Sequence, residues 1–285
     1  MVDWHAWNPF TRRESHTSQS ITTYKVLTLL SWFLAVISSV YYTVDEPHDG
    51  FTIRRRIWDL NDLYPTAFTL NPIIASIYWI VIFLLQIGYI TYLFSKDPAH
   101  VTAAANVGSH FILNNLLHFA FVLLFVRSHF VWAEVIQAIN FLNLTNLYFL
   151  HRTSPTFIHL PVVSGPYAWS YVALFWNGAL TLHHPTHFVP RVLGNIFVWS
   201  IPVFGYFCLI IFKDWTIGYS LSVLLASLGV AQFLKQAIAL QWIFAFVSMG
   251  LLFLSSSVVA QRSWVRNRPP APADQERAPL LDDNA

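Results

Sequence analysis

The sequence predicts an all-α, polytopic transmembrane helical bundle of about eight spans, and three observations lead to this fold class. The 285 residues are 55% hydrophobic and only 11% charged, whereas soluble domains carry roughly 25% charged residues. The mean hydropathy is +0.50. Several apolar runs reach the length of about 20 residues that a helix needs to cross the hydrocarbon core. A soluble globule of this size could not bury so much apolar surface, so lipid is expected to surround most of the chain.

Eight apolar segments follow one another along the chain, and each is predicted to be one membrane-spanning helix. These segments are 24–43, 71–94, 107–127, 131–150, 164–182, 191–212, 215–234 and 237–259. Only Lys235 and Gln236 separate the last two, and one continuous helix over both would be longer than the bilayer is thick. We therefore expect a tight break and two antiparallel spans there. The alternative is seven spans with a distorted region.

Proline-containing dipeptides predict where several of these helices begin and end. Asn71-Pro72 is typical of a helix start, because Asn caps the helix and Pro is tolerated at its first position. Asp97-Pro98 is expected to end the second span. Pro202 lies inside the sixth span, where it is expected to kink the helix.

The membrane domain is expected to cover residues 24–260, between a cytosolic N-terminal segment, 1–23, and a disordered cytosolic tail, 261–285. With eight spans and a cytosolic N-terminus, the cytosolic segments hold ten of the sixteen Lys and Arg residues. This bias follows the positive-inside rule, so both termini are predicted to be cytosolic. The 44–70 loop contains three consecutive arginines and five acidic residues. We interpret it as an amphipathic element on the membrane surface.

Polar side chains inside the apolar segments are the candidate functional residues, because a polar group in hydrocarbon is costly and should face the bundle interior. The candidates are Asn114, His118, Glu134, Gln137, Asn140 and Asn177. One interpretation is a polar-lined cavity between the third, fourth and fifth spans that binds or moves a small molecule. The other is a set of hydrogen bonds that hold the helices together, worth about 0.6–2 kcal/mol each.

Several kinds of chemistry receive no support from the sequence. The formal net charge of +2 does not indicate a nucleic-acid partner. No catalytic motif is present, so no catalytic residue and no cofactor is predicted, although an enzyme is not excluded. His183 and His187 have a workable spacing for a metal, but Pro185 lies between them and no further ligand is near. We therefore predict no metal site.

The C-terminal tail contains a candidate sorting signal. Glu276, Leu280 and Leu281 resemble the acidic dileucine motif that clathrin adaptors recognise. An exposed cytosolic tail would make the motif accessible. The motif favours a location in the endomembrane system, at the vacuolar or endosomal membrane.

Several segments also resemble known families. They are PTAFTLNPIIASIYWIVIFLLQIGYITYLF (65–94), FILNNLLHFAFVLLF (111–125), PYAWSYVALFWNGAL (166–180) and DWTIGYSLSVLLASLGVAQFLKQ (214–236). Their order is similar to that in the TspO-like group, the relatives of the tryptophan-rich sensory proteins, and Asn177 matches an Asn of that group. The whole chain, including WNPFTRRESH (7–16), also resembles a fungal family of uncharacterised membrane proteins. The TspO-like resemblance implies a sterol or tetrapyrrole ligand.

Together these observations predict a multi-pass membrane protein that binds or moves a small apolar or amphipathic molecule. Two alternatives stay open. One is a non-catalytic scaffold, assembly or trafficking factor, in which the polar side chains pair across a closed core. The other is an integral membrane enzyme that modifies lipid, in which Glu134 or a histidine meets a second reactive group.

Overall fold

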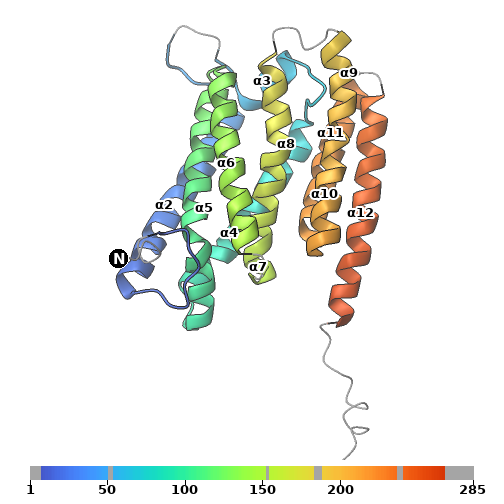
Figure 1. Ribbon diagram of the computed structural model, residues 1–285. Coiled ribbons are helices and arrows are strands. Elements are labelled where there is room, and N and C mark those ends of the chain that lie inside the picture. Colours follow the sequence, from blue (N-terminus) through green and yellow to red (C-terminus); the bar gives the residue numbers. More distant parts are fainter. Residues whose placement is uncertain (1–7, 51–53, 152–153, 183–187, 236–239, 267–285) are drawn as a thin grey trace, which may run out of the picture.

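The described residues form a bundle of long helices that run roughly parallel to one axis (Figure 1). The computed structural model describes residues 8–50, 54–151, 154–182, 188–235 and 240–266, and no strand occurs among them. The elements are α2 (Ser18–Val44), α3 (Ile57–Leu63), α4 (Pro72–Leu93), α5 (Pro98–Phe125), α6 (Phe130–Leu150), α7 (Thr156–Ile158), the π-helix η1 (His159–Ser164), α8 (Gly165–Leu180), α9 (Phe188–Phe197), α10 (Ser200–Phe212), α11 (Trp215–Lys235) and α12 (Gln241–Arg266).

Six helical stretches within the described residues are long and apolar enough to cross a membrane. They are α2, α4, α5, α9 together with α10, α11, and α12. The other two expected spans coincide with α6 and α8. Buried amides make α6 less apolar, and α8 has only 16 residues because the π-helix precedes it. The structure therefore supports an integral membrane protein of at least these six candidate spans, and the count of eight stays a prediction.

The outer surfaces of the helices are consistent with a lipid environment. Large apolar side chains are exposed along α2, α4, α10 and α12, among them Leu30, Ile37, Leu84, Ile210 and Leu254, each with more than half of its surface exposed. Soluble monomers do not leave contiguous apolar surface of this extent in water. These helix faces are therefore expected to contact lipid tails.

Asn71-Pro72 begins α4 as predicted, whereas Asp97-Pro98, which was expected to end the second span, follows the end of α4 at Leu93 and also begins α5. The Asn71 side chain accepts hydrogen bonds from the backbone N–H groups of Ile73 and Ile74, and the Asp97 side chain accepts one from Ala99. Each cap satisfies N–H groups that have no partner inside the helix. Two helices begin earlier than the apolar segments, α2 at Ser18 and α5 at Pro98. Hydropathy marks the part of a helix that lies in lipid, and both helices continue beyond it.

Pro161 explains the irregular start of the fifth long helix. A proline inside a helix removes one backbone N–H and clashes with the preceding turn, and here the chain adopts a π-helix over His159–Ser164. Two side chains of α4 bind carbonyl groups at this irregularity. Gln86 donates to the Pro161 carbonyl at 3.0 Å, and the Tyr78 hydroxyl donates to the Gly165 carbonyl at 2.7 Å. Membrane helices tolerate proline when neighbouring side chains satisfy the freed backbone in this way.

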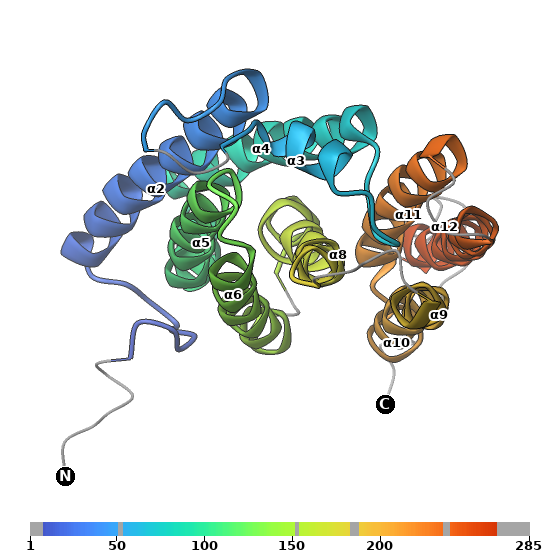
Figure 2. The ribbon, with the colours of Figure 1, turned by 90° about the horizontal axis from the view of Figure 1, so that it is seen from above.

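The predicted break between the last two segments is present. α11 ends at Lys235, α12 begins at Gln241, and the two helices pack side by side in opposite directions (Figures 1 and 2). Leu240, which has a left-handed backbone with φ of 69°, precedes α12. The expected irregularity at Pro202 is also present, because α9 ends at Phe197 and α10 begins at Ser200.

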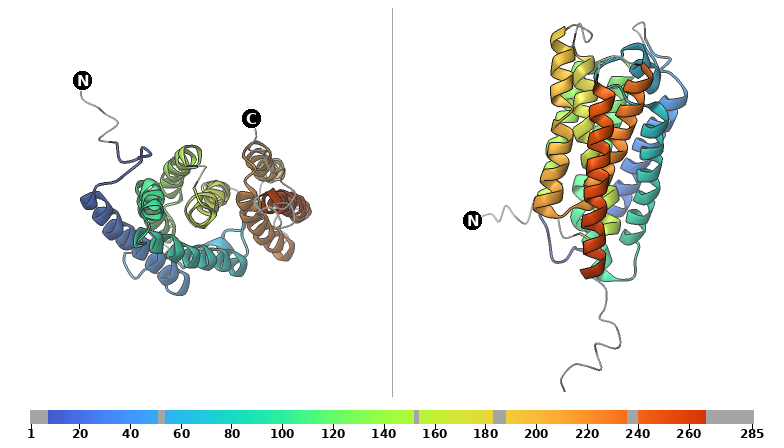
Figure 3. Two further views of the ribbon diagram at one scale, coloured as in Figure 1. Left: turned by 90° about the horizontal axis from the view of Figure 1, so that it is seen from below. Right: turned by 90° about the vertical axis from the view of Figure 1, so that its right-hand side faces the viewer.

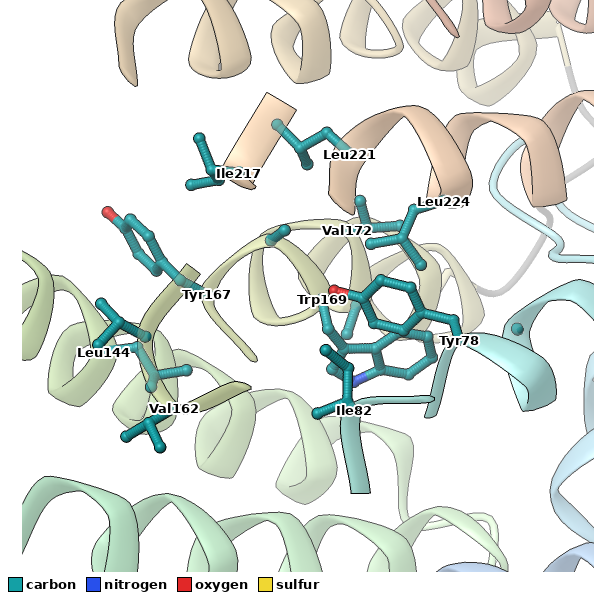
Figure 4. Close-up of a cluster of buried hydrophobic side chains, with 14 of the residues drawn as sticks. Tyr78, Ile82, Leu144, Val162, Tyr167, Trp169, Val172, Ile217, Leu221 and Leu224 are labelled. Carbon is teal, nitrogen blue, oxygen red and sulfur yellow. The ribbon is translucent and has the colours of Figure 1, made fainter. Parts of the chain in front are cut away.

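α8 lies in the middle of the bundle, between α4, α5 and α6 on one side and α9 to α12 on the other (Figure 2). The view from below in Figure 3 shows the same division. The Tyr78 ring of α4 stacks on Trp169 of α8 at a centroid distance of 6.4 Å. Figure 4 shows these two rings beside Ile82, with Val172 of α8 facing Leu224 of α11. This buried layer joins the two halves of the bundle.

The 44–70 loop is docked at one end of the bundle. In its helix α3, the side chains of Leu60 and Asn61 are buried, with exposed fractions of 0% and 1%. The Asn61 side chain exchanges hydrogen bonds with the backbone of Leu70 and accepts one from the Trp176 indole N–H at 3.0 Å. Tertiary packing therefore holds α3 in place, and α3 closes the end of the cavity described next.

Candidate functional site

An apolar cavity lies between α2, α3, α4, α5 and α8. It has a volume of about 190 Å³, and we call it the aromatic cavity. Its lining side chains are predominantly large and apolar, and they come from all five helices. They are Ser39, Val40, Thr43, Val44, Ile57, Trp58, Ser76, Trp79, Ile80, Phe83, His118, Phe121, Val122, Phe125, Trp169 and Trp176.

Helical spacing brings the aromatic residues to one wall. Trp169 and Trp176 are seven residues apart, so they lie two turns apart on the same face of α8. Their ring centroids are 5.8 Å apart. Trp79 of α4 meets Trp169 edge-on at 5.4 Å, and Phe125 of α5 lies 4.6 Å from Trp176. Contacts of this kind stabilise pairs of rings beyond the burial of their surface, so the wall is expected to be rigid.

A few of the lining residues carry polar atoms. His118 of α5 is held between two neighbours: its Nε2 atom is 2.9 Å from the Ser39 hydroxyl, and its ring lies 4.5 Å from the Trp79 ring. The indole N–H groups of Trp58 and Trp169 are buried and have no hydrogen-bond partner among the described residues. An unpaired buried donor costs about 1–3 kcal/mol. A ligand oxygen in the cavity could accept from either indole.

The rim of the cavity faces the expected lipid. Val40 and Val44 of α2 and Ile80 of α4 line the cavity, and yet they are 55%, 70% and 54% exposed. α2 and α4 are neighbours in the bundle, and these side chains lie on the outer surface of both. A molecule dissolved in the bilayer could therefore enter the cavity between α2 and α4.

Of the six candidate residues from the sequence, His118 lines the aromatic cavity and the others bridge helices. Asn140 of α6 donates to Asn114 of α5 at 3.0 Å. Gln137 donates to the Ser170 hydroxyl of α8 at 2.8 Å. Asn177 of α8 donates to the Glu134 carboxylate at 2.8 Å and to the Phe130 carbonyl at 2.9 Å. These polar side chains do not line one common cavity. Their hydrogen bonds match the interpretation in which they join helices.

The tryptophans are the site residues that sequence reasoning missed. Trp and Tyr are enriched where a membrane meets water, and this tendency does not predict tryptophans in the bundle interior. A signal was nevertheless present. Trp169 and Trp176 share a helix face, and each lies within an apolar run rather than at its end. Aromatic side chains at such positions must pack against another helix or line a cavity.

A buried ion pair at the opposite end of the bundle was also missed. His159 of η1 lies 2.8 Å from the Asp214 carboxylate, in the turn before α11. The other Asp214 oxygen accepts from Thr216 and Ile217, so it caps α11. Burial raises the pKa of the Asp214 carboxyl, but the bonds from His159, Thr216 and Ile217 outweigh it, and the pKa lies below its ordinary value.

The contacts around Asp214 bear on the alternative prediction that the protein is an enzyme. The Ser164 and Thr216 hydroxyls bond to each other at 2.7 Å, and Thr216 also bonds to Asp214. Within the described part of the chain, neither hydroxyl bonds to the His159 ring. The Asp214 carboxylate is within hydrogen-bond reach of the Thr216 hydroxyl, but it also caps α11 and binds His159. These bonds fit a structural role in which the His159–Asp214 pair fastens η1 to α11.

Two groups of predicted residues lie outside the described residues. They are His183 and His187, and the tail residues Glu276, Leu280 and Leu281. Among the residues that are described, no group of three or more His, Cys, Asp or Glu side chains could hold a metal ion.

The fold and the cavity define the class as a helical integral membrane protein with a cavity lined by aromatic side chains. Residues 191–281 match a family described as a fungal protein of unknown function (DUF1774). The chain is also 32% identical over 123 residues to the uncharacterised protein C637.03 of Schizosaccharomyces pombe. That alignment covers 43% of this chain and 44% of the relative, so the chain matches less than half of the relative's length. No solved structure matches.

These matches support the predicted similarity to a fungal family of unknown function. Neither concerns the tryptophan-rich sensory proteins, so the TspO-like resemblance stays a prediction.

Proposed function

We propose that this membrane protein binds a mostly apolar molecule with one hydrogen-bond-accepting oxygen, which enters the aromatic cavity from the bilayer. The observation that carries the proposal is a pair of buried, unpartnered indole N–H groups, which belong to two residues that line this otherwise apolar space, Trp58 and Trp169. Ligand pockets typically combine apolar walls with a few placed polar groups. Trp169 is 5% exposed, so water is a poor alternative partner for its N–H group.

The cavity volume limits the size of the inserted group. About 190 Å³ exceeds the roughly 150 Å³ of a cavity that holds benzene, and it is below the roughly 300 Å³ at which drug-sized pockets begin. The space therefore suits a ring or a short stretch of acyl chain with its oxygen. A sterol inserted by its hydroxyl end fits this limit, with the remainder of the molecule in lipid. A whole tetrapyrrole would need more room than the cavity has.

A cavity-filling substitution tests the proposal. Ser76 lines the cavity on α4, whereas the next residue, Ile77, is 54% exposed on the outer surface. We expect Ser76→Trp to reduce labelling by a photoreactive, alkyne-tagged sterol and a similarly tagged fatty alcohol by at least about tenfold, because the indole occupies the ligand's space. The matched control, Ile77→Trp, adds the same side chain toward lipid and is expected to label as the wild type does.

A second variant tests the hydrogen bond. Trp169→Phe keeps an aromatic ring in the wall and removes the N–H donor. The expected loss is about 1 kcal/mol, or about fivefold in affinity, measured by competition of an untagged sterol or fatty alcohol against the same probes. Equal labelling of wild type, Ser76→Trp and Ile77→Trp would contradict the proposal. It would favour the scaffold alternative, which the interhelical bonds of Asn140, Gln137 and Asn177 also support.

The proposed topology has both termini in the cytosol. α2 begins and α12 ends at the same end of the bundle (Figure 1), as an even number of spans requires. Under this topology the tail would expose the dileucine motif of Glu276, Leu280 and Leu281 to an adaptor, which supports a vacuolar or endosomal location. We expect Leu280→Ala/Leu281→Ala to move a fluorescently tagged chain to the plasma membrane. An unchanged distribution of the double variant would contradict adaptor sorting.

A further inference from the structure

The segment before α2 folds across the cytosolic end of the bundle, in the orientation proposed above. Asn106 of α5 holds it: the Arg13 backbone N–H donates to the Asn106 side-chain oxygen at 2.8 Å, and the Asn106 amide donates back to the Arg13 carbonyl at 3.0 Å. His16 lies 3.1 Å from the same Asn106 oxygen. Figure 3 shows this segment from below, next to α5. The reciprocal bonds fix the position of Arg12, which precedes Arg13.

A small pocket lies beneath this segment, and we call it the end pocket. Its volume is about 50 Å³, and its lining residues are Arg12, Ala103, Asn106, His151, Ser154 and Pro155. One water molecule needs only about 10–15 Å³ of such space, so the end pocket is large enough for a tetrahedral oxyanion. An open groove of about 820 Å³ adjoins it and shares Arg12, Ala103 and Asn106. A group attached to the anion would have room there.

A buried imidazole without a partner points to a ligand in this pocket. His151 follows the last residue of α6 and is 3% exposed, and its Nε2 atom has no hydrogen-bond partner among the described residues. Burial, with smaller contributions from His110 and Arg12, lowers the pKa of His151 to about 4. The neutral ring has one N–H donor. A ligand oxygen that accepts a hydrogen bond from this ring would give the buried Nε2 atom the partner that it lacks among the described residues.

We propose that the end pocket binds the phosphate group of a phosphomonoester, with Arg12, His151 and Asn106 as the recognising side chains. Arginine suits this ligand because its planar guanidinium donates two parallel hydrogen bonds to phosphate oxygens. The second amide hydrogen of Asn106 can point to the anion, since the first is bound to the Arg13 carbonyl. The phosphate could belong to a lipid headgroup of the cytosolic leaflet or to a soluble molecule, and both present the same group. This site is independent of the aromatic cavity and of its proposed ligand.

Glu14 sets a limit on the attached group. It lines the adjoining groove together with Arg13 and Ser15. A second negative charge beside the first phosphate would be repelled by this carboxylate. The site is therefore expected to prefer a single phosphate to a ligand with two adjacent phosphates.

The test uses the full-length chain in phosphatidylcholine nanodiscs, with histidine NMR and thermal unfolding as readouts. The probes are inorganic phosphate, dioctanoyl phosphatidic acid and, as an uncharged control, dioctanoylglycerol. We expect at least one phosphate probe to shift the ¹⁵N resonances of His151 and to raise the melting temperature, and the uncharged control to do neither. Binding of the lipid alone would identify a headgroup site, and binding of inorganic phosphate as well would identify the phosphate itself.

Variants assign the binding to the pocket. Arg12→Gln and His151→Gln are each expected to weaken the affinity by about tenfold or more. Arg13→Gln is the matched control, because Arg13 holds Asn106 through its backbone and its side chain lines only the outer groove; it is expected to change the affinity by less than about threefold. Two results would overturn the proposal: no response of His151 to either phosphate probe, or equal affinity in the wild type and Arg12→Gln. The wild-type NMR response decides the question even if a variant fails to fold.

Discussion

Replacing Asp214 with alanine is expected to lower the free energy of unfolding by about 3–5 kcal/mol. Its carboxylate is buried, pairs with His159 at 2.8 Å, and caps α11 through Thr216 and Ile217. Loss of one partner from a buried pair costs about 3–5 kcal/mol when both groups are charged, because the other partner is left without compensation. Loss of a cap alone costs about 1 kcal/mol. Denaturant unfolding of the purified protein in detergent, followed by tryptophan fluorescence, measures the effect.

A second ion pair supplies the control for Asp214→Ala. Asp62 lies 2.8 Å from Lys235, but 51% of its side chain is exposed. Surface pairs of this kind contribute about 0–1 kcal/mol, so Asp62→Ala is expected to change the stability little. If the two alanine variants were equally stable, the His159–Asp214 pair would not fasten η1 to α11 as the geometry indicates.

The effect of Asp214→Ala on stability is expected to depend on pH, because the pKa of Asp214 is lowered in the folded protein. A carboxyl whose pKa is lower in the folded state stabilises the protein above its unfolded pKa, which is about 3.9. That stabilisation is lost as the pH falls through the lower folded value. The stability difference between wild type and Asp214→Ala is therefore expected to persist over about pH 5–7 and to shrink below about pH 4. A difference that grew on acidification would contradict the direction of this shift.

The sequence was most informative where a single residue type has a strong local effect. Asn71-Pro72 marked the start of α4, Asp97-Pro98 marked the end of the second span just after Leu93, and the short polar break at Lys235 separated α11 from α12. Hydropathy also identified every long helix of the described chain. These features depend on residues close together in the sequence, so they can be inferred without knowing which helices are neighbours.

The candidate site depends on which helices meet, and sequence reasoning could not supply that. The polar side chains of Asn140, Gln137 and Asn177 were correctly expected to face the bundle interior, but local pattern does not distinguish a cavity from a pair of bonded amides. The cavity arises because Trp79 of α4 and Trp169 of α8 are brought together from positions 90 residues apart. α3, which closes its end, is a short helix with no clear apolar signal.

Replacing Gly218 with leucine, at the α11–α12 interface, is expected to lower the free energy of unfolding by about 3 kcal/mol. This is the second large expected effect. A Cβ atom at Gly218 would overlap the Ser256 side chain of α12 and lie 3.2 Å from the Ser256 Cβ atom. Small residues allow membrane helices to approach closely, and overpacking such a contact costs about 1–3 kcal/mol or somewhat more. The rest of the leucine side chain would have to push α12 away, and the nearby bond from the Tyr219 hydroxyl to Ser257, 2.9 Å long, would be strained.

Gly250 on α12 provides the matched control, because a Cβ atom there meets nothing within 4 Å. Gly250→Leu adds the same side chain to the same helix pair at a position where its Cβ atom has free space. It also replaces a glycine, which is less favourable than other residues inside a helix by about 0.5–1 kcal/mol. The two variants are therefore expected to shift stability in opposite directions in the same unfolding assay. Equal stability of Gly218→Leu and Gly250→Leu would show that α11 and α12 do not pack through Gly218. The close contact would then have to be replaced by an arrangement in which the two helices are farther apart in the membrane.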